Sequence, residues 1–330
     1  MEGDMIVYVN YHYNREKING KKIVNGIFEI FDCIGEGAFW KVFLVKRNFE
    51  EDTNFYVFKE GQLSGDCKYN MNLLRSDEEV QQEETRRGVQ EYLILEKVNH
   101  KNITRLYECI MDHEIDKCVL IMEYADLGIL MNLNQTEDGY YYNQNLINFI
   151  LKNCIGESEK TCIINETESI SFTTHHKILI LTAKFILRQL AEALEYLHER
   201  FITHRDIKPD NVSMKKSDKQ IKLLDFSIAK KLSAFDDEII SETGTPAFDP
   251  PEIMQRENYN PFIGDIYLLG ATIYVFLFNS INFSLEQKEN LKLLYENDPQ
   301  LSELITLMMN SDSKMRPTAK EILKNKIFDC

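Results

Sequence analysis

The stretch of sequence that decides the fold is His204-Arg205-Asp206-Ile207-Lys208-Pro209-Asp210-Asn211. It directly follows a segment with helical apolar spacing that ends in Tyr196-Leu197-His198. Charged pairs and a proline within eight residues would by themselves suit an ordinary surface turn. The order of the residues favours a functional loop over an ordinary turn, because a lysine stands two positions after Asp206 and an asparagine five positions after it. Motifs on both sides of the stretch decide between the two interpretations.

Further motifs follow downstream in a fixed order: Leu223-Leu224-Asp225-Phe226-Ser227, Gly244-Thr245-Pro246-Ala247-Phe248-Asp249-Pro250-Pro251-Glu252, Asp265 to Gly270, and Lys314-Met315-Arg316-Pro317. Together with the first stretch they resemble the catalytic loop, the metal-binding Asp-Phe-Gly, the end of the activation loop and the central helix of eukaryotic protein kinases. The ordered matches run from Gly35 to Arg316, which is nearly the whole chain. The resemblance implies an α+β, two-lobed protein kinase fold.

Two upstream features fit the same resemblance. The stretch Ile34-Gly35-Glu36-Gly37-Ala38-Phe39-Trp40-Lys41-Val42 lies between two predicted strands, and its glycines would let backbone N–H groups approach phosphates. It lacks the Gly-Lys-Ser/Thr of a P-loop and leads into a strand, which argues against a Rossmann site. Lys59 ends an apolar strand and would be an ordinary edge charge unless Glu91, on a predicted amphipathic helix, faces it.

The resemblance implies that the chain is a serine/threonine protein kinase that uses ATP and Mg²⁺. Asp206 would orient the substrate hydroxyl or accept its proton, and Lys208 would steady the γ-phosphate. Asn211 and Asp225 would carry Mg²⁺, a hard ion that prefers oxygen ligands. Lys208 marks serine/threonine rather than tyrosine kinases, and Thr245 agrees with this assignment.

The nucleotide would be bound mainly by the smaller lobe. Lys59, held by Glu91, would contact the α- and β-phosphates, and adenine would hang from backbone groups around Glu123 to Ala125 with Met122 at the back of the pocket. The full predicted set is Ile34, Gly35, Gly37, Val42, Lys59, Glu91, Met122, Glu123 and Ala125. His204 and Phe226 are assigned to core packing rather than to ligand binding.

Arg205, which precedes the catalytic aspartate, adds a regulatory expectation. The resemblance implies that it needs an anion, supplied either by phosphorylated Ser241 or Thr243 or by unmodified acids, namely Glu242, Asp236, Asp237 and Glu238. We favour the unmodified acids, because they would also repel an added phosphate. Arg87 precedes Glu91 by one helical turn and could share the anion. The resemblance also implies that Arg316 pairs with Glu252, and we expect this ion pair to be buried and structural.

Two departures from the kinase pattern leave alternatives open. Ser227 replaces a glycine, and Trp40 fills the third glycine position, which lies past the loop tip and is little constrained. A pseudokinase or nucleotide-binding scaffold is therefore the main alternative to an active enzyme. A small-molecule kinase of the same broad fold is a third hypothesis, but the segment Gly244 to Glu252 resembles the platform that holds a peptide substrate.

Several short stretches resemble the calcium/calmodulin-dependent kinase kinases and related upstream kinases, so a protein substrate that is itself a kinase is one expectation. These stretches are Glu91 to Leu95, Asn99 to Ile103, Asp126 to Met131, Pro246 to Glu252 and Gly270 to Phe278. Only 14 residues follow Arg316, too few for a full calmodulin-binding helix. Calmodulin regulation is therefore not expected from this chain.

The expected organisation is a β-rich lobe followed by a larger helical lobe. We predict an N-terminal extension over 1–26 and a kinase domain over about 27–328. Within the domain we place an N-lobe over about 27–124 with one main helix, a hinge at 123–126, an insertion or long loop over about 131–176, and a C-lobe over about 177–328. The insertion is rich in Asn and Tyr and shows little periodicity.

Composition excludes several other classes. The 330 residues are 44% apolar and carry a net charge of −15, which argues against a disordered chain and against a nucleic-acid binder. The seven cysteines lack paired spacing, so neither a zinc site nor a disulfide framework is expected. The acidic start does not resemble a secretory signal, and the apolar run from Ile266 to Phe278 is shorter than a membrane span. We expect a cytoplasmic protein without a membrane segment, and a buried helix at that run.

Overall fold

The fold is described from a computed structural model. The described residues are 8–10, 12–36, 40–48, 52–62, 87–134, 139–156, 172–239, 244–255, 258–281, 283 and 286–328. The chain divides into two compact units. Residues 1–99 with 104–124 form the first unit, and residues 100–103 with 125–330 form the second.

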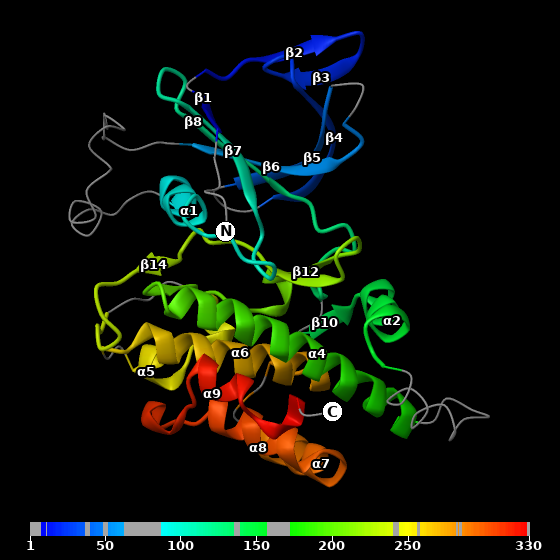
Figure 1. The fold of residues 1–330 in the computed structure, drawn as a ribbon, viewed down its shortest axis with the longest axis vertical. Coiled ribbons are helices and arrows are strands. Elements are labelled where there is room, and N and C mark those ends of the chain that lie inside the picture. Colours follow the sequence, from blue (N-terminus) through cyan, green and yellow to red (C-terminus); the bar gives the residue numbers. More distant parts are fainter. Residues whose placement is uncertain are drawn as a thin grey trace. The chain divides into compact units, whose positions relative to one another are not determined.

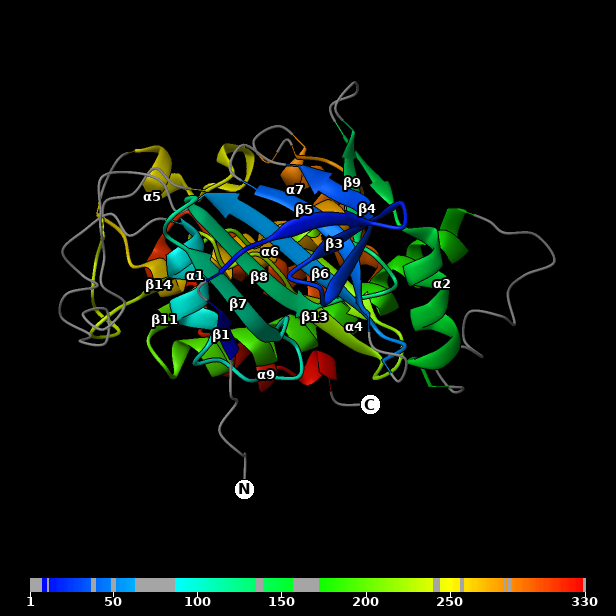
Figure 2. The ribbon, with the colours of Figure 1, turned by 90° about the horizontal axis from the view of Figure 1, so that it is seen from above.

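The first unit is built on an eight-stranded sheet with the order β1-β7-β8-β6-β5-β4-β3-β2 (Figures 1 and 2). All neighbouring strands are antiparallel except β1 and β7, which are parallel. The unit also holds helix α1 (Arg87–Leu95). The strands are β1 (Tyr8–Asn10), β2 (Arg15–Ile18), β3 (Lys21–Val24), β4 (Phe28–Glu36), β5 (Trp40–Arg47), β6 (Phe55–Gln62), β7 (Leu106–Asp112) and β8 (Lys117–Glu123).

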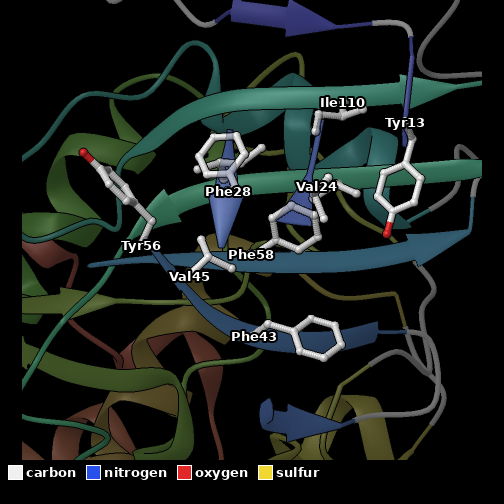
Figure 3. Close-up of a cluster of buried hydrophobic side chains, with 10 residues drawn as sticks. Tyr13, Val24, Phe28, Phe43, Val45, Tyr56, Phe58 and Ile110 are labelled. Atoms are coloured by element: carbon white, nitrogen blue, oxygen red, sulfur yellow. The ribbon is translucent and has the colours of Figure 1, made fainter. Parts of the chain in front are cut away.

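One face of this sheet carries an aromatic core. Side chains two apart along a strand share a face, and Phe43 and Val45 of β5 lie with Tyr56 and Phe58 of β6 in one buried cluster. Figure 3 shows Phe58 among the labelled side chains of this cluster. Its ring is tilted by 58° to that of Phe28, with 6.3 Å between the ring centroids. Lys59 alternates with Phe58 and therefore points to the opposite face.

Residues that precede the expected domain boundary belong to this sheet. We expected residues 1–26 to be an extension, but β2 and β3 continue the sheet beside β4, and Tyr13 and Val24 enter the aromatic core. Asp112 accepts the backbone N–H of Tyr13 at 2.8 Å, and Glu60 accepts the hydroxyl of Tyr13 at 3.4 Å. The described part of the extension is thus an integral part of the first unit.

The second unit is mainly helical (Figure 1). Its long helices are α4 (Phe172–His198) and α6 (Pro261–Phe278). Its other helices are α2 (Gln144–Asn153), α5 (Pro251–Met254), α7 (Gln287–Asn297), α8 (Pro299–Met308) and α9 (Ala319–Leu323). Its strands form three short pairs, β9 (Met131–Asn134) with β10 (Gly139–Tyr142), β11 (Ile202–Thr203) with β14 (Lys230–Lys231), and β12 (Val212–Lys215) with β13 (Gln220–Leu223).

Helix α6 confirms the buried helix expected at Ile266 to Phe278. It begins at Pro261 because the side chain of Asn260 caps it, accepting the backbone N–H groups of Phe262 and Ile263. Among the described residues, α6 is the one helix long and apolar enough to cross a membrane, and 89% of it is buried inside the protein. Such burial is typical of a core helix.

The interpretation of 131–176 as a long loop was wrong where the structure describes it. Strands β9 and β10 form a hairpin, and α2 follows with Leu146, Ile147 and Ile150 buried. The side chain of Asn143 caps α2 by accepting the backbone N–H of Leu146 at 3.1 Å. Residues 157–171 lie outside the described part, and α4 already begins at Phe172.

Candidate active site

In the first unit, β6 and α1 bring Lys59 and Glu91 together as predicted. The Lys59 Nζ lies 2.6 Å from Glu91 Oε2. Lys59 is 5% exposed and Glu91 is 0% exposed. Because a buried charge is very unfavourable without a partner, the carboxylate of Glu91 stabilises the ammonium of Lys59 inside the unit.

The other predicted nucleotide-binding residues of the first unit lie on its central strands. Ile34 on β4 is 46% exposed, whereas Met122 and Glu123 at the end of β8 are buried. A Cβ added to Gly35 would meet the Val42 side chain at 3.5 Å, an ordinary contact, so the strand itself does not require a glycine there. Ala125 begins the second unit. Gly37 lies outside the described residues.

In the second unit, one hydrogen-bond network surrounds the carboxylate of Asp206. Thr245 Oγ1 donates to Asp206 Oδ1 at 2.8 Å. Lys208 Nζ lies 2.9 Å from Asp206 Oδ2, and Asn211 Nδ2 donates to the same oxygen at 2.9 Å. Lys208 also donates to Thr245 Oγ1 at 2.6 Å. The structure thus brings together the three predicted catalytic residues, Asp206, Lys208 and Asn211, with Thr245, which was predicted as an activation-loop residue.

The loop that carries Asp206 is held by a residue that sequence reasoning named only as the start of a motif. Asp265 is fully buried on α6. Its carboxylate accepts the backbone N–H of His204 at 2.9 Å and that of Arg205 at 2.7 Å, and it lies 3.1 Å from His198 Nε2. These contacts fix the backbone immediately before Asp206, and they let Arg205 adopt a left-handed φ of 70°.

His204 and Phe226 lie in the core, as predicted. Both are 0% exposed, and their rings meet edge to face at 4.7 Å. His204 Nε2 also contacts the backbone oxygen of Leu224 at 2.9 Å. The imidazole therefore links the catalytic loop to the segment that carries Asp225.

The oxygen ligands predicted for Mg²⁺ fit that ion. Asn211 uses Nδ2 for its bonds to the backbone oxygen and the carboxylate of Asp206, and no described residue donates to its Oδ1. Asp225 lies just after β13 with a left-handed φ of 56°, a strained conformation typical of functional positions. No group of three metal-ligating side chains occurs among the described residues. Mg²⁺ is commonly bound by one or two protein oxygen ligands, with its remaining ligands supplied by phosphate groups and water.

The first departure from the kinase pattern carries no backbone strain. Ser227 is absent from the described residues with a positive φ, so its conformation does not require a glycine. Its backbone N–H donates to Asp225 Oδ1 at 3.3 Å. Serine at this position is therefore compatible with the geometry of Asp225.

Glu252 and Arg316 form the predicted buried ion pair. Two parallel bonds join them, Nη1 to Oε1 at 2.6 Å and Nη2 to Oε2 at 2.8 Å. Arg316 is 4% exposed, donates through Nε to the Asn310 backbone oxygen at 2.9 Å, and lies 4.9 Å from the centre of the Tyr267 ring. Burial raises the pKa of Tyr267 to about 12.

The regulatory residues are only partly described. Arg205 donates to the backbone oxygen of Ile228 at 3.2 Å. Burial lowers the pKa of Lys230, the charge of Arg205 lowers it further, and the charge of Asp237 opposes both effects. Asp237, one of the expected acids, accepts the backbone N–H groups of a turn at Ser233 and Ala234. Ser241, Glu242, Thr243 and the side chain of Arg87 lie outside the described residues.

Sequence reasoning missed a residue that contacts the catalytic loop. Tyr140 on β10 donates its hydroxyl to Asp210 Oδ2 at 2.8 Å, and its ring meets Phe248 edge to face at 6.4 Å. Burial and the charge of Asp210 raise the pKa of Tyr140. The sequence held no signal for this contact, because it depends on where the β9–β10 hairpin packs.

Comparisons with known proteins agree with this geometry. A sequence profile of the protein kinase domain matches residues 28–328. The chain is 30% identical over 311 residues to the "Probable serine/threonine-protein kinase nek2" of Dictyostelium discoideum, which covers 90% of this chain and 61% of that protein. It is 42% identical over 118 residues to a "Serine/threonine-protein kinase stk11 homolog" of the same organism, covering 35% of this chain and 20% of that protein. It is 24% identical over 330 residues to "Serine/threonine-protein kinase stk11" of Xenopus laevis, covering 95% of this chain and 62% of that protein. The chain thus spans less than two thirds of each of these relatives.

Proposed function

Because this chain belongs to the protein kinase family, we propose that it is an active serine/threonine kinase that transfers the γ-phosphate of ATP to a protein hydroxyl. The observation that carries the proposal is the network in which Lys208, Thr245 and Asn211 surround the carboxylate of Asp206. The names of the relatives, all serine/threonine protein kinases, support the substrate class.

Asp206 is the residue that handles the proton. Three donors hold its carboxylate in one orientation, so a substrate hydroxyl bound against it would be aligned for attack and its proton accepted or oriented. Thr245 Oγ1 donates to Oδ1, and the hydroxyl of a substrate serine or threonine is the same chemical group. Lys208 places a positive charge beside this carboxylate and would steady the γ-phosphate.

The remaining predicted residues bind the nucleotide and its metal. Mg²⁺, when bound with ATP, supplies charge neutralisation for the phosphates. Asp225 and Asn211 offer the oxygen ligands for the ion, and Lys59, oriented by Glu91, offers a fixed positive charge for the α- and β-phosphates. Gly35 and Gly37 would let backbone N–H groups approach the phosphates. Adenine would bind to backbone groups around Glu123 to Ala125 with Met122 at the back of the pocket, and Ile34 and Val42 complete the nucleotide-binding set.

Geometry favours an active enzyme over a pseudokinase scaffold. Lys59 and Glu91 are paired, Asp206 and Asn211 are joined by a hydrogen bond, and Ser227 requires no strained backbone. Activation by an anion at Arg205, from Ser241 or Thr243 after phosphorylation or from Glu242 without it, remains part of the proposal. The proposal also includes a substrate that is itself a kinase, a relationship to the calcium/calmodulin-dependent kinase kinase group, and a cytoplasmic location.

The test is transfer of labelled γ-phosphate to a generic serine/threonine substrate with Mg²⁺, using the full chain. Asp206→Asn should lower turnover by about 10²- to 10⁴-fold while Mg·ATP still binds. Asp312→Asn is the matched control, because this exposed residue caps a short turn and asparagine caps equally well. Equal turnover of wild type and Asp206→Asn would refute the proposal.

A further inference from the structure

Trp40 lies against the lysine that pairs with Glu91. Sequence reasoning placed it past the loop tip, at a little-constrained position. Trp40 does lie past the loop, as the first residue of β5, but its ring is in contact, because the ring centre lies 5.0 Å from Lys59 Nζ.

The register of the sheet explains how the indole reaches the ammonium. Val42 lies directly opposite Lys59, and Trp40 lies directly opposite Gly61. Trp40 and Lys59 are therefore diagonal neighbours on one face, a separation that aromatic and long side chains can span. Because Gly61 has no side chain, the position opposite Trp40 leaves room for the indole to lean toward Lys59.

The electrostatic setting makes the contact strong. Lys59 is 5% exposed, and a cation over an aromatic face is stabilised more when it is removed from water. The Trp40 Nε1–H is buried and has no acceptor among the described residues. Hydrogen bonding therefore does not account for the placement of the indole, whereas its contact with the ammonium does.

We propose that Trp40 is a positioning residue for Lys59, which holds the ammonium from a second direction while Glu91 holds it from the first. The proposal rests on the proposed function, because it takes Lys59 to be the phosphate contact. A bulky aromatic at a position where the kinase pattern has glycine is then a gain for this chain rather than a sign of lost activity.

The first test needs no kinase activity. Trp40 is the only tryptophan of the chain, so intrinsic fluorescence reports on its surroundings. Lys59→Met should shift or intensify the emission. The control Lys41→Met should not, because Lys41 lies on the opposite face of β5 and pairs with Glu36 in an exposed contact at 3.0 Å. Unchanged emission in Lys59→Met would contradict the proposal that the Trp40 ring contacts the Lys59 ammonium.

The second test measures the affinity for Mg·ATP by calorimetry. Trp40→Leu should weaken binding about 3- to 10-fold. Trp40→Phe, which keeps an aromatic face, should restore it to within about twofold. In the Lys59→Met background, Trp40→Leu should cause no further loss of Mg·ATP affinity, because Trp40 acts through Lys59 and that lysine is absent. Thermal unfolding of each variant shows whether it is folded.

The outcomes separate the two proposals. Equal Mg·ATP affinity in wild type and folded Trp40→Leu, or the same loss with and without Lys59, would overturn the positioning role. If Trp40→Leu does not fold, the role of Trp40 is still tested by the Mg·ATP affinity of Trp40→Phe. The fluorescence of Lys59→Met and Lys41→Met tests the contact itself. The variants could show the expected changes in fluorescence and in Mg·ATP affinity while the wild-type protein transfers no phosphate. That result would refute the proposed function and leave the positioning role of Trp40 standing.

Discussion

Two ion pairs with buried cations in the described part of the chain, Lys59 with Glu91 in the first unit and Arg316 with Glu252 in the second, differ in how the cation is held. The guanidinium of Arg316 makes two parallel bonds to Glu252, a third bond to the Asn310 backbone, and a ring contact. The ammonium of Lys59 lies 2.6 Å from one oxygen of Glu91 and 5.0 Å from the centre of the Trp40 ring.

The difference reflects what each pair is for. A guanidinium is planar and holds its donors in a fixed geometry. At Arg316 all three of its nitrogens donate to protein groups, which suits a structural role. An ammonium is a compact point charge that can face several anions. The lysine pair is thus the one suited to a site that receives a phosphate, and the arginine pair is the one suited to holding the fold.

Breaking the arginine pair should have the largest effect on stability. Arg316→Ala leaves Glu252 without its partner, so the free energy of unfolding should fall by about 3–5 kcal/mol. Urea denaturation followed by circular dichroism measures the loss. A loss below about 1 kcal/mol would mean that the pair does not hold the second unit together.

Breaking the lysine pair should instead act mainly on turnover. Lys59→Met removes a charge that stabilises the phosphates, so the rate of phosphate transfer should fall by about 10²- to 10³-fold. Single-turnover transfer from labelled ATP measures the chemical step. If turnover survived, Lys59 would be a second structural charge and the contrast with Arg316 would fail.

Replacing both members of each pair by apolar residues sharpens the comparison. Such replacements avoid a stranded buried charge, so both double variants should recover about 1–3 kcal/mol relative to the sum of their single variants. Glu252→Leu with Arg316→Met should remain active, and Lys59→Met with Glu91→Leu should not. Paired unfolding and transfer assays test this, and strict additivity at either pair would show that its members do not interact.

The smallest effect is expected at Ser227. Because its backbone has no left-handed φ, Ser227→Gly gains no relief from strain and only makes the unfolded chain more flexible. The free energy of unfolding should fall by about 0.4–1 kcal/mol, with little change in transfer rate. A large gain in activity would show that serine restricts a movement of the Asp225 segment.

Sequence reasoning succeeded where a residue type and its spacing carry the chemistry. It placed Lys59 with Glu91 and Glu252 with Arg316, and it named the residues around Asp206. It did not foresee that Asp265 accepts two backbone N–H groups of the catalytic loop, because the resemblance marked that aspartate only as the start of a helix.

It failed where packing between distant segments decides the structure. The polar N-terminal residues show no clear strand pattern, and the entry of Tyr13 and Val24 into the core depends on strands that come later in the chain. The β9–β10 hairpin likewise depends on the packing of Tyr140 against Asp210 and Phe248. Short segments of this kind are specified by their partners rather than by local propensity.

The parallel pairing of β1 with β7 bears on the order in which the chain acquires its structure. Tyr8 is aligned with Glu108 and Asn10 with Ile110, so β1 cannot pair in the sheet until β7, which lies much later in the chain, has been synthesised. Domains are synthesised from the N-terminus at about 5–20 residues per second, so β1 would remain unpaired for several seconds. Contacts of such long sequence separation also form late and slow folding. During that time β1, an edge strand of the finished sheet, would be open to binding by a chaperone.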